Sequence, residues 1–328
     1  MNRALRLVRR RLITAIPVIG LVTIGAFLLL EAAPGDAVDA YILSLGGADA
    51  NMVAELRASW GLDQSPWARL LAYLAALARG DLGWSVSFSR PILDIILERL
   101  PNTLLLMSAS TALSFMLGSA LGIFAGARPG SLRDRLLSVG SLALYAIPGF
   151  WLALVLVIFF SINLRWLPLS GIETIASGKH GFDRALDIGR HLVLPVASLG
   201  IIYLALYLRM MRAGMAEVWR QDFIRAAQAK GLSRQRIVLR HVARNALLPV
   251  VTMLGLQSAA MLGGSVVIES VFAVPGLGRL ASEAVASRDT PLLLGIVLVS
   301  ALVVIAINLM VDIAYALLDP RVGAAEAS

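Results

Sequence analysis

The sequence predicts an all-α membrane protein with six transmembrane helices. Of the 328 residues, 58% are hydrophobic and only 15% are charged, whereas an average soluble domain has about 25% charged residues. The mean hydropathy is +0.80. Six apolar runs are long enough to cross a bilayer, and the middle of each lacks Asp, Glu, Lys and Arg, which are costly inside the hydrocarbon. The six runs are 12–30, 103–127, 136–162, 192–211, 246–268 and 292–317.

The basic residues predict how these spans are oriented. An even number of spans places both termini on one side of the membrane. The segments expected on that side hold 18 Arg and Lys residues, and the short loops on the other side hold six. Because Arg and Lys are enriched in cytoplasmic loops, we expect the tails 1–11 and 321–328 and the loop 212–245 to be cytoplasmic. The first apolar run is too long for a cleaved signal peptide, so an uncleaved anchor is expected.

Composition and motifs argue against several other classes of protein. The net charge of +8 does not indicate nucleic-acid binding, because the basic residues flank apolar runs and do not interleave with aromatic residues. The chain has no cysteine, which excludes a thiolate metal site. Neither Lys179 nor Lys230 lies in a phosphate-binding G-x-x-x-x-G-K-[ST] loop, and the three histidines form no H-E-x-x-H pair. We therefore expect no catalytic residue, no metal site and no cofactor.

The segment 31–101 is expected to form a small helical region outside the membrane. Two helices are predicted there from capping and stop residues. The first helix is expected to be capped by Asp49 or Asn51 and ended by Gly61, and the second to be capped by Ser65 and ended by Gly80. An apolar face on the second helix favours packing against the transmembrane bundle or a position in the headgroup layer. This face comprises Trp67, Leu70, Leu71, Leu74 and Leu77.

The spans carry marks of close packing and bending. Small residues recur at every fourth position of the second span, which allows another helix backbone to approach closely. They are Ser110, Ser114, Gly118, Gly122 and Gly126. Pro148 beside Gly149 should kink the third span, and three glycines, at 255, 263 and 264, should loosen the fifth.

A few polar residues lie within or close to the ends of the spans. Gln257 and Ser258 are either pore-lining groups or partners in interhelical hydrogen bonds. Glu269 and Asp312 could relay a proton or cation, but near the end of a span a carboxylate more often reaches the interface or pairs with an arginine.

The loop between the fourth and fifth spans is the most informative segment. It is long and basic, which is typical of a surface where a partner docks. Phe223, Ala226 and Ala227 have helical spacing, Gly231 can end that helix in the left-handed conformation, and Ser233 can cap a second helix. The loop is therefore expected to form two short helices joined at a glycine.

Several segments resemble the permease subunits of ATP-binding-cassette importers, in the dipeptide, oligopeptide and nickel branch. The similarity is carried in the loop by RAAQAKGLS and RHVARNALLP, and extends over nearly the whole chain. The other similar segments are APGD (33–36), RGDLGWS (79–85), YALLDPRV (315–322) and VFAVPGLGRL (271–280), the last of which is expected to be a turn. The general signature begins with Glu where this chain has Arg225, a difference that also occurs in this branch.

The resemblance implies the type I importer transmembrane fold, in the inner membrane of a bacterium. Residues 102–320 would form the permease core, and 31–101 would meet an extracytoplasmic solute-binding protein. A second homologous permease subunit would complete the pathway, and two ATPase subunits would bind the ATP. The residues implied in coupling to the ATPase are Arg220, Asp222, Phe223, Arg225, Ala226, Ala227, Lys230 and Gly231.

The sequence leaves the transported solute open. The resemblance favours di- or oligopeptides, and nickel or another metal chelate, glutathione or a sugar remain alternatives. A stand-alone secondary transporter is the alternative class, but it predicts charged residues inside the bundle and paired broken helices. An intramembrane enzyme predicts polar catalytic groups there, which the sequence lacks.

Overall fold

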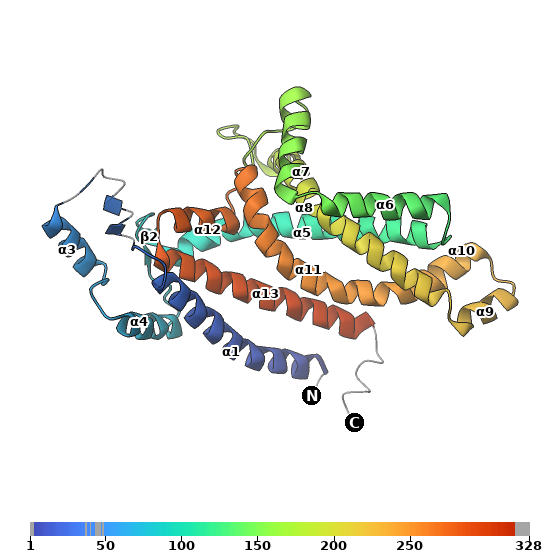
Figure 1. Ribbon diagram of the computed structural model, residues 1–328, viewed down its shortest axis with the longest axis horizontal. Helices are drawn as coiled ribbons and strands as arrows, with labels where there is room; N and C mark the ends of the chain where they lie inside the picture. Colours follow the sequence, from blue (N-terminus) through green and yellow to red (C-terminus); the bar gives the residue numbers. More distant parts are fainter. Residues whose placement is uncertain (1–2, 37, 40, 43–46, 48, 319–328) are drawn as a thin grey trace. The chain divides into compact units, whose positions relative to one another are not determined.

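A computed structural model describes residues 3–36, 38–39, 41–42, 47 and 49–318 (Figure 1). Over these residues the chain is helical apart from loops and one short hairpin. Five helices are long and apolar enough to cross a membrane, and a bent pair of helices makes a sixth candidate. The predicted all-α membrane fold is therefore confirmed. The C-terminal tail 321–328 lies outside the described residues.

The chain forms two compact units. Unit 1 comprises Met1–Pro101 and Gly276–Ala306, and unit 2 comprises Asn102–Pro275 and Ile307–Ser328. Helices α5 (Ile92–Gly126) and α13 (Thr290–Leu318) contribute residues to both units. The boundary after Pro101 coincides with the start of the expected permease core, whereas 276–306 group with unit 1.

Unit 1 contains helices α1 (Arg3–Glu31), α3 (Ala50–Ser59), α4 (Pro66–Ala78) and α12 (Leu277–Ala286). The predicted caps are confirmed, because the Asp49 carboxylate and the Ser65 hydroxyl accept backbone N–H groups of α3 and α4. The predicted stops are also confirmed: Gly61 and Gly80 follow the two helices with positive φ angles, which glycine adopts without steric cost.

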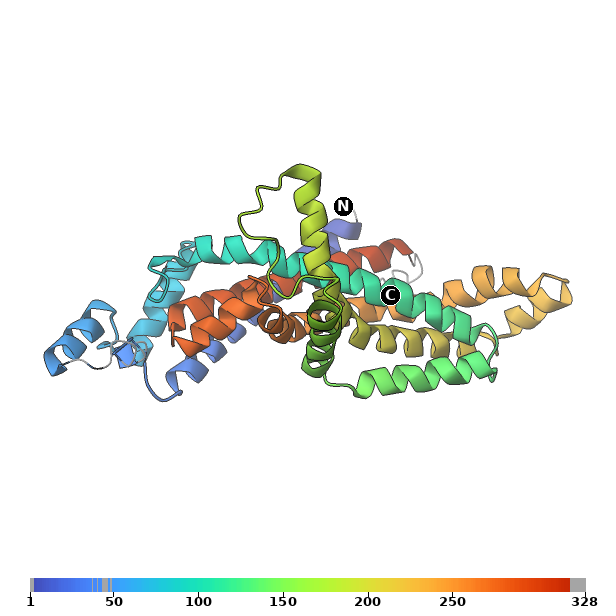
Figure 2. The ribbon, with the colours of Figure 1, turned by 90° about the horizontal axis from the view of Figure 1, so that it is seen from above.

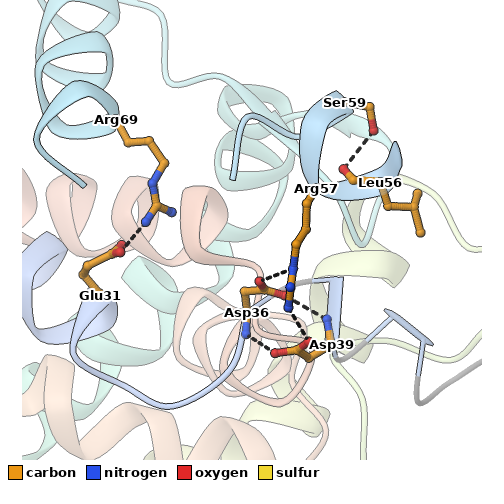
Figure 3. Close-up of polar contacts among 7 residues, drawn as sticks. All are labelled: Glu31, Asp36, Asp39, Leu56, Arg57, Ser59 and Arg69. Carbon is orange, nitrogen blue, oxygen red and sulfur yellow. Dashed lines mark hydrogen bonds and ion pairs between the residues drawn. The ribbon is translucent and has the colours of Figure 1, made fainter. Parts of the chain in front are cut away.

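Ion pairs tie the segment after α1 to α3 (Figure 3). Asp36 and Asp39 each accept the backbone N–H of the other. Arg57 of α3 donates to Asp36 from Nε at 3.1 Å and to Asp39 from Nη2 at 2.9 Å. The Arg57 guanidinium thus holds Asp36 of the APGD segment, and the Arg288 guanidinium donates to the Pro34 carbonyl of the same segment.

Helix α4 packs against other helices of unit 1. Leu70 is buried with Phe27 and Leu294, so the predicted packing of this face is confirmed for Leu70. Trp67 and Leu71 lie on another side and are 66% and 67% exposed. The apolar face is therefore divided between the protein and its surroundings.

A buried aspartate organises the short hairpin of unit 1. Strands β1 (Trp84–Ser85) and β2 (Arg90–Pro91) pair antiparallel. Asp289 Oδ2 accepts the Ser85 hydroxyl at 2.6 Å and the Ser87 N–H at 2.9 Å, while Oδ1 accepts the Leu292 N–H at the start of α13. One carboxylate therefore caps α13 and fixes the hairpin.

The turn predicted over 271–280 is only partly correct. It is confined to 272–276, because α12 begins at Leu277 and Gly278 lies inside this helix. The reason is the spacing of Leu277, Leu280 and Ala284, which places them on one helical face. That face is buried in a cluster with Ile92, Ile95, Ile96 and Leu292.

Unit 2 contains the bent pair of helices. Helix α6 (Leu132–Ala146) is followed by α7 (Gly149–Leu156) and by the π-helical segment η1 (Val157–Asn163). The chain bends by 97° at the break before Gly149. Figure 1 shows α7 rising away from α6. The kink predicted at Pro148 is confirmed as a full break in the helix.

The stripe of small residues on α5 packs against α8 (Gly181–Val218), as predicted. A Cβ atom on Gly118 would lie 2.7 Å from the Leu204 carbonyl oxygen, and one on Gly122 would lie 2.6 Å from Met211 Cβ. Added Cβ atoms would therefore overlap α8. The absence of side chains lets the two backbones approach, which favours association inside a membrane.

Helix α11 (Arg244–Val271) is continuous through its three glycines. Gly255 packs closely against Val311. The Glu269 carboxylate is buried and accepts the Thr103 hydroxyl at 2.7 Å. It therefore lies inside unit 2 and does not reach out to an interface.

Candidate functional site

The basic loop forms two short helices at the end of α8. Helix α9 (Asp222–Ala229) is followed by α10 (Arg234–Arg236) and by the π-helical segment η2 (Ile237–Ala243), which continues into α11. Figure 2 shows α9 and α10 at the tip where α8 ends and α11 begins. The two predicted helices are thus present, and the second runs without a break into the fifth span.

Gly231 ends α9 as predicted. Its φ angle is +73°. The Gly231 N–H donates to the Gln228 carbonyl, and the Leu232 N–H donates back to the Ala227 carbonyl, which is the paired arrangement typical of a glycine-terminated helix. Ser233 occupies the cap position of α10, but its side chain makes no capping hydrogen bond.

One face of α9 is anchored in the core of unit 2. Ile224 and Ala227 are three residues apart and are 1% and 6% exposed. They belong to a cluster with Met211 and Met215 of α8 and Val242 of η2. The loop is therefore packed against the ends of α8 and η2 and continues their hydrophobic core.

Two donors from the loop reach the C-terminal end of α5. The Trp219 indole N–H donates to the Gly126 carbonyl at 2.9 Å, and the Arg234 guanidinium donates to the Ala127 carbonyl at 3.0 Å. Carbonyl groups at the end of a helix have no partner within the helix, and a cation is favoured there by the helix dipole. Arg234 also lies over the Trp219 ring.

A bidentate ion pair joins α8 to α6 close to this loop. Arg212 Nε donates to Asp134 Oδ1 at 2.8 Å, and Arg212 Nη2 donates to Oδ2 at 3.0 Å. The Asp134 side chain is only 2% exposed. It also accepts the Gly130 N–H, which fixes the turn between α5 and α6.

The opposite face of α9 is open. Phe223 is 45% exposed, and Arg220, Asp222, Arg225, Ala226 and Lys230 are exposed as well. Arg225 is paired with Asp222 at 3.3 Å. The open face thus offers one aromatic side chain and the small side chains of Ala226 and Ala229, and Arg220 and Lys230 beside it give more positive than negative charge.

The structure separates two pairs of residues that the sequence grouped. Ala226 is exposed whereas Ala227 is buried, so only Ala226 can contact a partner directly. Ser258 is 5% exposed, and its hydroxyl donates to the Leu254 carbonyl of its own helix. Gln257 is half-buried and is the one of that pair with accessible surface.

Sequence reasoning did not identify the anchors of the loop. Ile224 could have been found, because it has helical spacing to Ala227 and is the larger of the two. The other anchors connect residues 78 to 107 positions apart, and no local pattern points to them. They are Trp219, Arg234 and the Arg212–Asp134 pair.

In the part of the chain that the structure describes, no group of three His, Asp or Glu side chains is arranged to bind a metal ion.

These features define a multi-pass membrane protein that presents an anchored helix, within a basic loop, outside its spans. Residues 118–324 match the family described as "Binding-protein-dependent transport system inner membrane component". The oligopeptide transport system permease protein AppB of Bacillus subtilis (strain 168) is 38% identical over 315 residues, which cover 95% of this chain and 98% of that protein. The di/tripeptide transport system permease protein DppB of Pseudomonas aeruginosa (strain UCBPP-PA14) is 38% identical, with 97% and 98% covered. The chain belongs to this family of inner membrane transport components.

A solved structure has a similar fold. A chain of the MetNI methionine ABC transporter, in an inward-facing conformation, superposes with a TM-score of 0.56 over 69% of this chain and 97% of that chain. The sequence identity is 17%, so the similarity concerns the fold alone. It confirms the predicted transmembrane fold of a type I ABC importer.

Proposed function

We propose that this permease subunit imports di- or oligopeptides and that α9 receives the movement of a partner ATPase. The observation that carries the proposal is the division of α9 into an anchored face and an open face. Ile224 and Ala227 hold the helix in unit 2, while Phe223, Arg225 and Ala226 remain available to a partner. The names of the two relatives, at 38% identity over nearly the whole chain, support peptides as the solute.

The open face of α9 has the chemistry of a docking surface. A half-exposed aromatic residue in the middle of a contact commonly supplies much of the binding energy. Phe223 and Ala226 would enter a groove on the ATPase, and Arg220, Arg225 and Lys230 would meet acidic groups at its rim. ATP is bound and hydrolysed by two such partner subunits, not by this chain.

The anchors of the loop explain how movement would reach the membrane. Trp219 and Arg234 bind carbonyl groups at the end of α5, and Arg212 binds Asp134 of α6. A displacement of α9 would therefore move α5 and α6 with it, because these hydrogen bonds and the ion pair connect the loop and α8 to both helices. Closure of the ATPase dimer would rock this subunit against a second, homologous permease subunit and open the pathway alternately to either side.

The outer side of the subunit would receive the peptide. We place both termini and α9 in the cytoplasm of a bacterium, on the basis of the asymmetric distribution of Arg and Lys. The segment 31–101 then lies outside the inner membrane, where a solute-binding protein would dock. The ion pairs of Arg57 with Asp36 and Asp39 would hold this surface in one shape.

The test is reconstitution of the complete transporter in proteoliposomes with a labelled peptide. Gly231→Leu should strain the turn, so that ATP hydrolysis continues while uptake falls. Gly178→Leu is the matched control, since Gly178 lies outside both the loop and the segment 31–101 and has a similar φ angle, +64° against +73°, and neither glycine has a neighbour within 4 Å of an added Cβ. Coupled uptake that survives in Gly231→Leu, or peptide accumulation by this chain without any ATPase, would refute the proposal.

A further inference from the structure

An open cavity of about 460 Å³ lies in unit 2 beside η2, and no residue of α9 lines it. Its walls are apolar and come from Ile123 of α5, Met211 of α8, Ala243 at the end of η2 and Leu247 at the start of α11. Leu239, which is 56% exposed, contributes to its open side. The cavity has the lining expected for a hydrocarbon chain.

Two arginines also line this cavity. Arg240 and Arg244 are exposed and lie four residues apart, which places them on one side of the helical segment. Two other arginines of the region have carboxylate partners: Arg212 binds Asp134, and Arg225 binds Asp222. Among the described residues, neither the Arg240 nor the Arg244 side chain forms an ion pair or a hydrogen bond. Two unpaired guanidinium groups beside an apolar cavity favour an amphiphilic anion.

We propose that this cavity binds an anionic phospholipid of the cytoplasmic leaflet. The phosphate would accept hydrogen bonds from Arg240 and Arg244, because guanidinium groups often form bidentate hydrogen bonds with phosphate. One acyl chain would lie against Leu239 and Leu247. The inference rests on the proposed orientation, which places this end of α8 at the cytoplasmic surface, where anionic lipids attract basic residues.

The lipid would add a contact that the protein chain does not provide. The cavity borders Met211 and Ala243, which belong to the same core cluster as the anchors Ile224 and Ala227 of α9. A lipid that fills the cavity would therefore support the packing beneath the coupling helix. Transport should depend on anionic lipid more strongly than on the length or saturation of the acyl chains.

The test measures lipid bound to the complete transporter after extensive detergent washing. The complex is taken from nanodiscs of phosphatidylcholine with phosphatidylglycerol, and the retained phosphatidylglycerol is quantified by mass spectrometry. Arg240→Gln and Arg244→Gln should each lower retention about fivefold, which is the effect of one basic residue near an anionic surface. Arg236→Gln is the matched control, because Arg236 is exposed one turn away but does not line the cavity. It should change retention less than twofold.

Two results would overturn the proposal. Equal losses in all three variants would show that only general surface charge attracts the lipid. A second permease subunit in the cavity would be shown by Leu247→Cys, the sole cysteine of that variant: a photoreactive maleimide attached to its thiol would then cross-link to the partner subunit while no phosphatidylglycerol is retained. Lipid retention is measured without nucleotide or peptide, so its failure is distinguishable from failure of the coupling role of α9.

Discussion

Truncating Phe223 to alanine should weaken binding of the ATPase more than any other single change on the open face of α9. The exposed 45% of the side chain is the part available to a partner. A buried phenylalanine removes about 200 Å² from water, so this part corresponds to about 90 Å². At about 25 cal/mol per Å², its burial contributes about 2 kcal/mol. The expected loss of affinity is therefore roughly 30-fold.

The assay is a titration of the purified ATPase subunit onto the immobilised permease complex in detergent, in which binding is measured by biolayer interferometry. Phe223→Ala should leave the melting temperature of the permease nearly unchanged, because the side chain is not part of the core cluster around Ile224. Leu132→Ala provides the control: Leu132 is 72% exposed at the start of α6 and does not lie on α9. The affinity of the Leu132→Ala variant for the ATPase should stay within twofold of that of the unmodified chain.

The reasoning would be refuted by a Phe223→Ala complex that binds the ATPase with unchanged affinity. A lower affinity accompanied by a large drop in melting temperature would also contradict it, since the effect would then come from unfolding of α9. Only loss of affinity at constant stability identifies Phe223 as a contact with the partner.

Three further substitutions and one control test the packing. Ile224→Ala, at a position 1% exposed, should lower the unfolding free energy by about 2–5 kcal/mol and make the loop sensitive to limited proteolysis. Gly122→Ala should overlap Met211 and cost about 1–3 kcal/mol, whereas Gly140→Ala in α6, with no atom within 4 Å of the new Cβ, should leave the melting temperature equal or higher. Asp289→Ala should cost about 2 kcal/mol, because α13 loses its cap and two hairpin donors lose their acceptor; an unchanged melting temperature would contradict this account.

Features set by a few neighbouring residues could be predicted from the sequence. Gly231 ends α9 because few other residues adopt a positive φ angle readily. Asp49 and Ser65 cap helices because their side-chain oxygens reach the first free N–H groups. The break at Pro148 follows from its missing N–H group, and the number of spans follows from hydropathy.

Features that depend on pairing between distant helices could not be predicted. The burial of Ala227 on the inner face of α9 could not be predicted, because the sequence does not show which side of a short helix meets α8. The first turn of α12 was included in the predicted turn, since Gly276 and Gly278 favour a turn and the cluster that buries the apolar face of α12 is formed by distant residues. The cavity beside Arg240 likewise exists only once three helices are assembled.

The Arg212–Asp134 pair provides a test of how α8 and α6 are held together. Removing one partner of a fully buried pair costs about 3–5 kcal/mol, because the other charge stays buried. The Arg212 side chain is 40% exposed and the Asp134 side chain 2%. Water therefore screens part of the interaction between the two charges, and the expected cost of Arg212→Gln is about 1–3 kcal/mol. Asp134→Asn should cost less, since the remaining guanidinium can reach water.

A double-mutant cycle separates the pair from the individual side chains. Combining Asp134→Asn with Arg212→Gln removes the buried carboxylate, so the double variant should be more stable than Arg212→Gln alone. Melting temperature and peptide uptake per ATP hydrolysed should recover together, because both depend on α6 following α8. If the two losses simply add, the carboxylate is not held by Arg212, and the movement of the loop must reach α6 by packing alone.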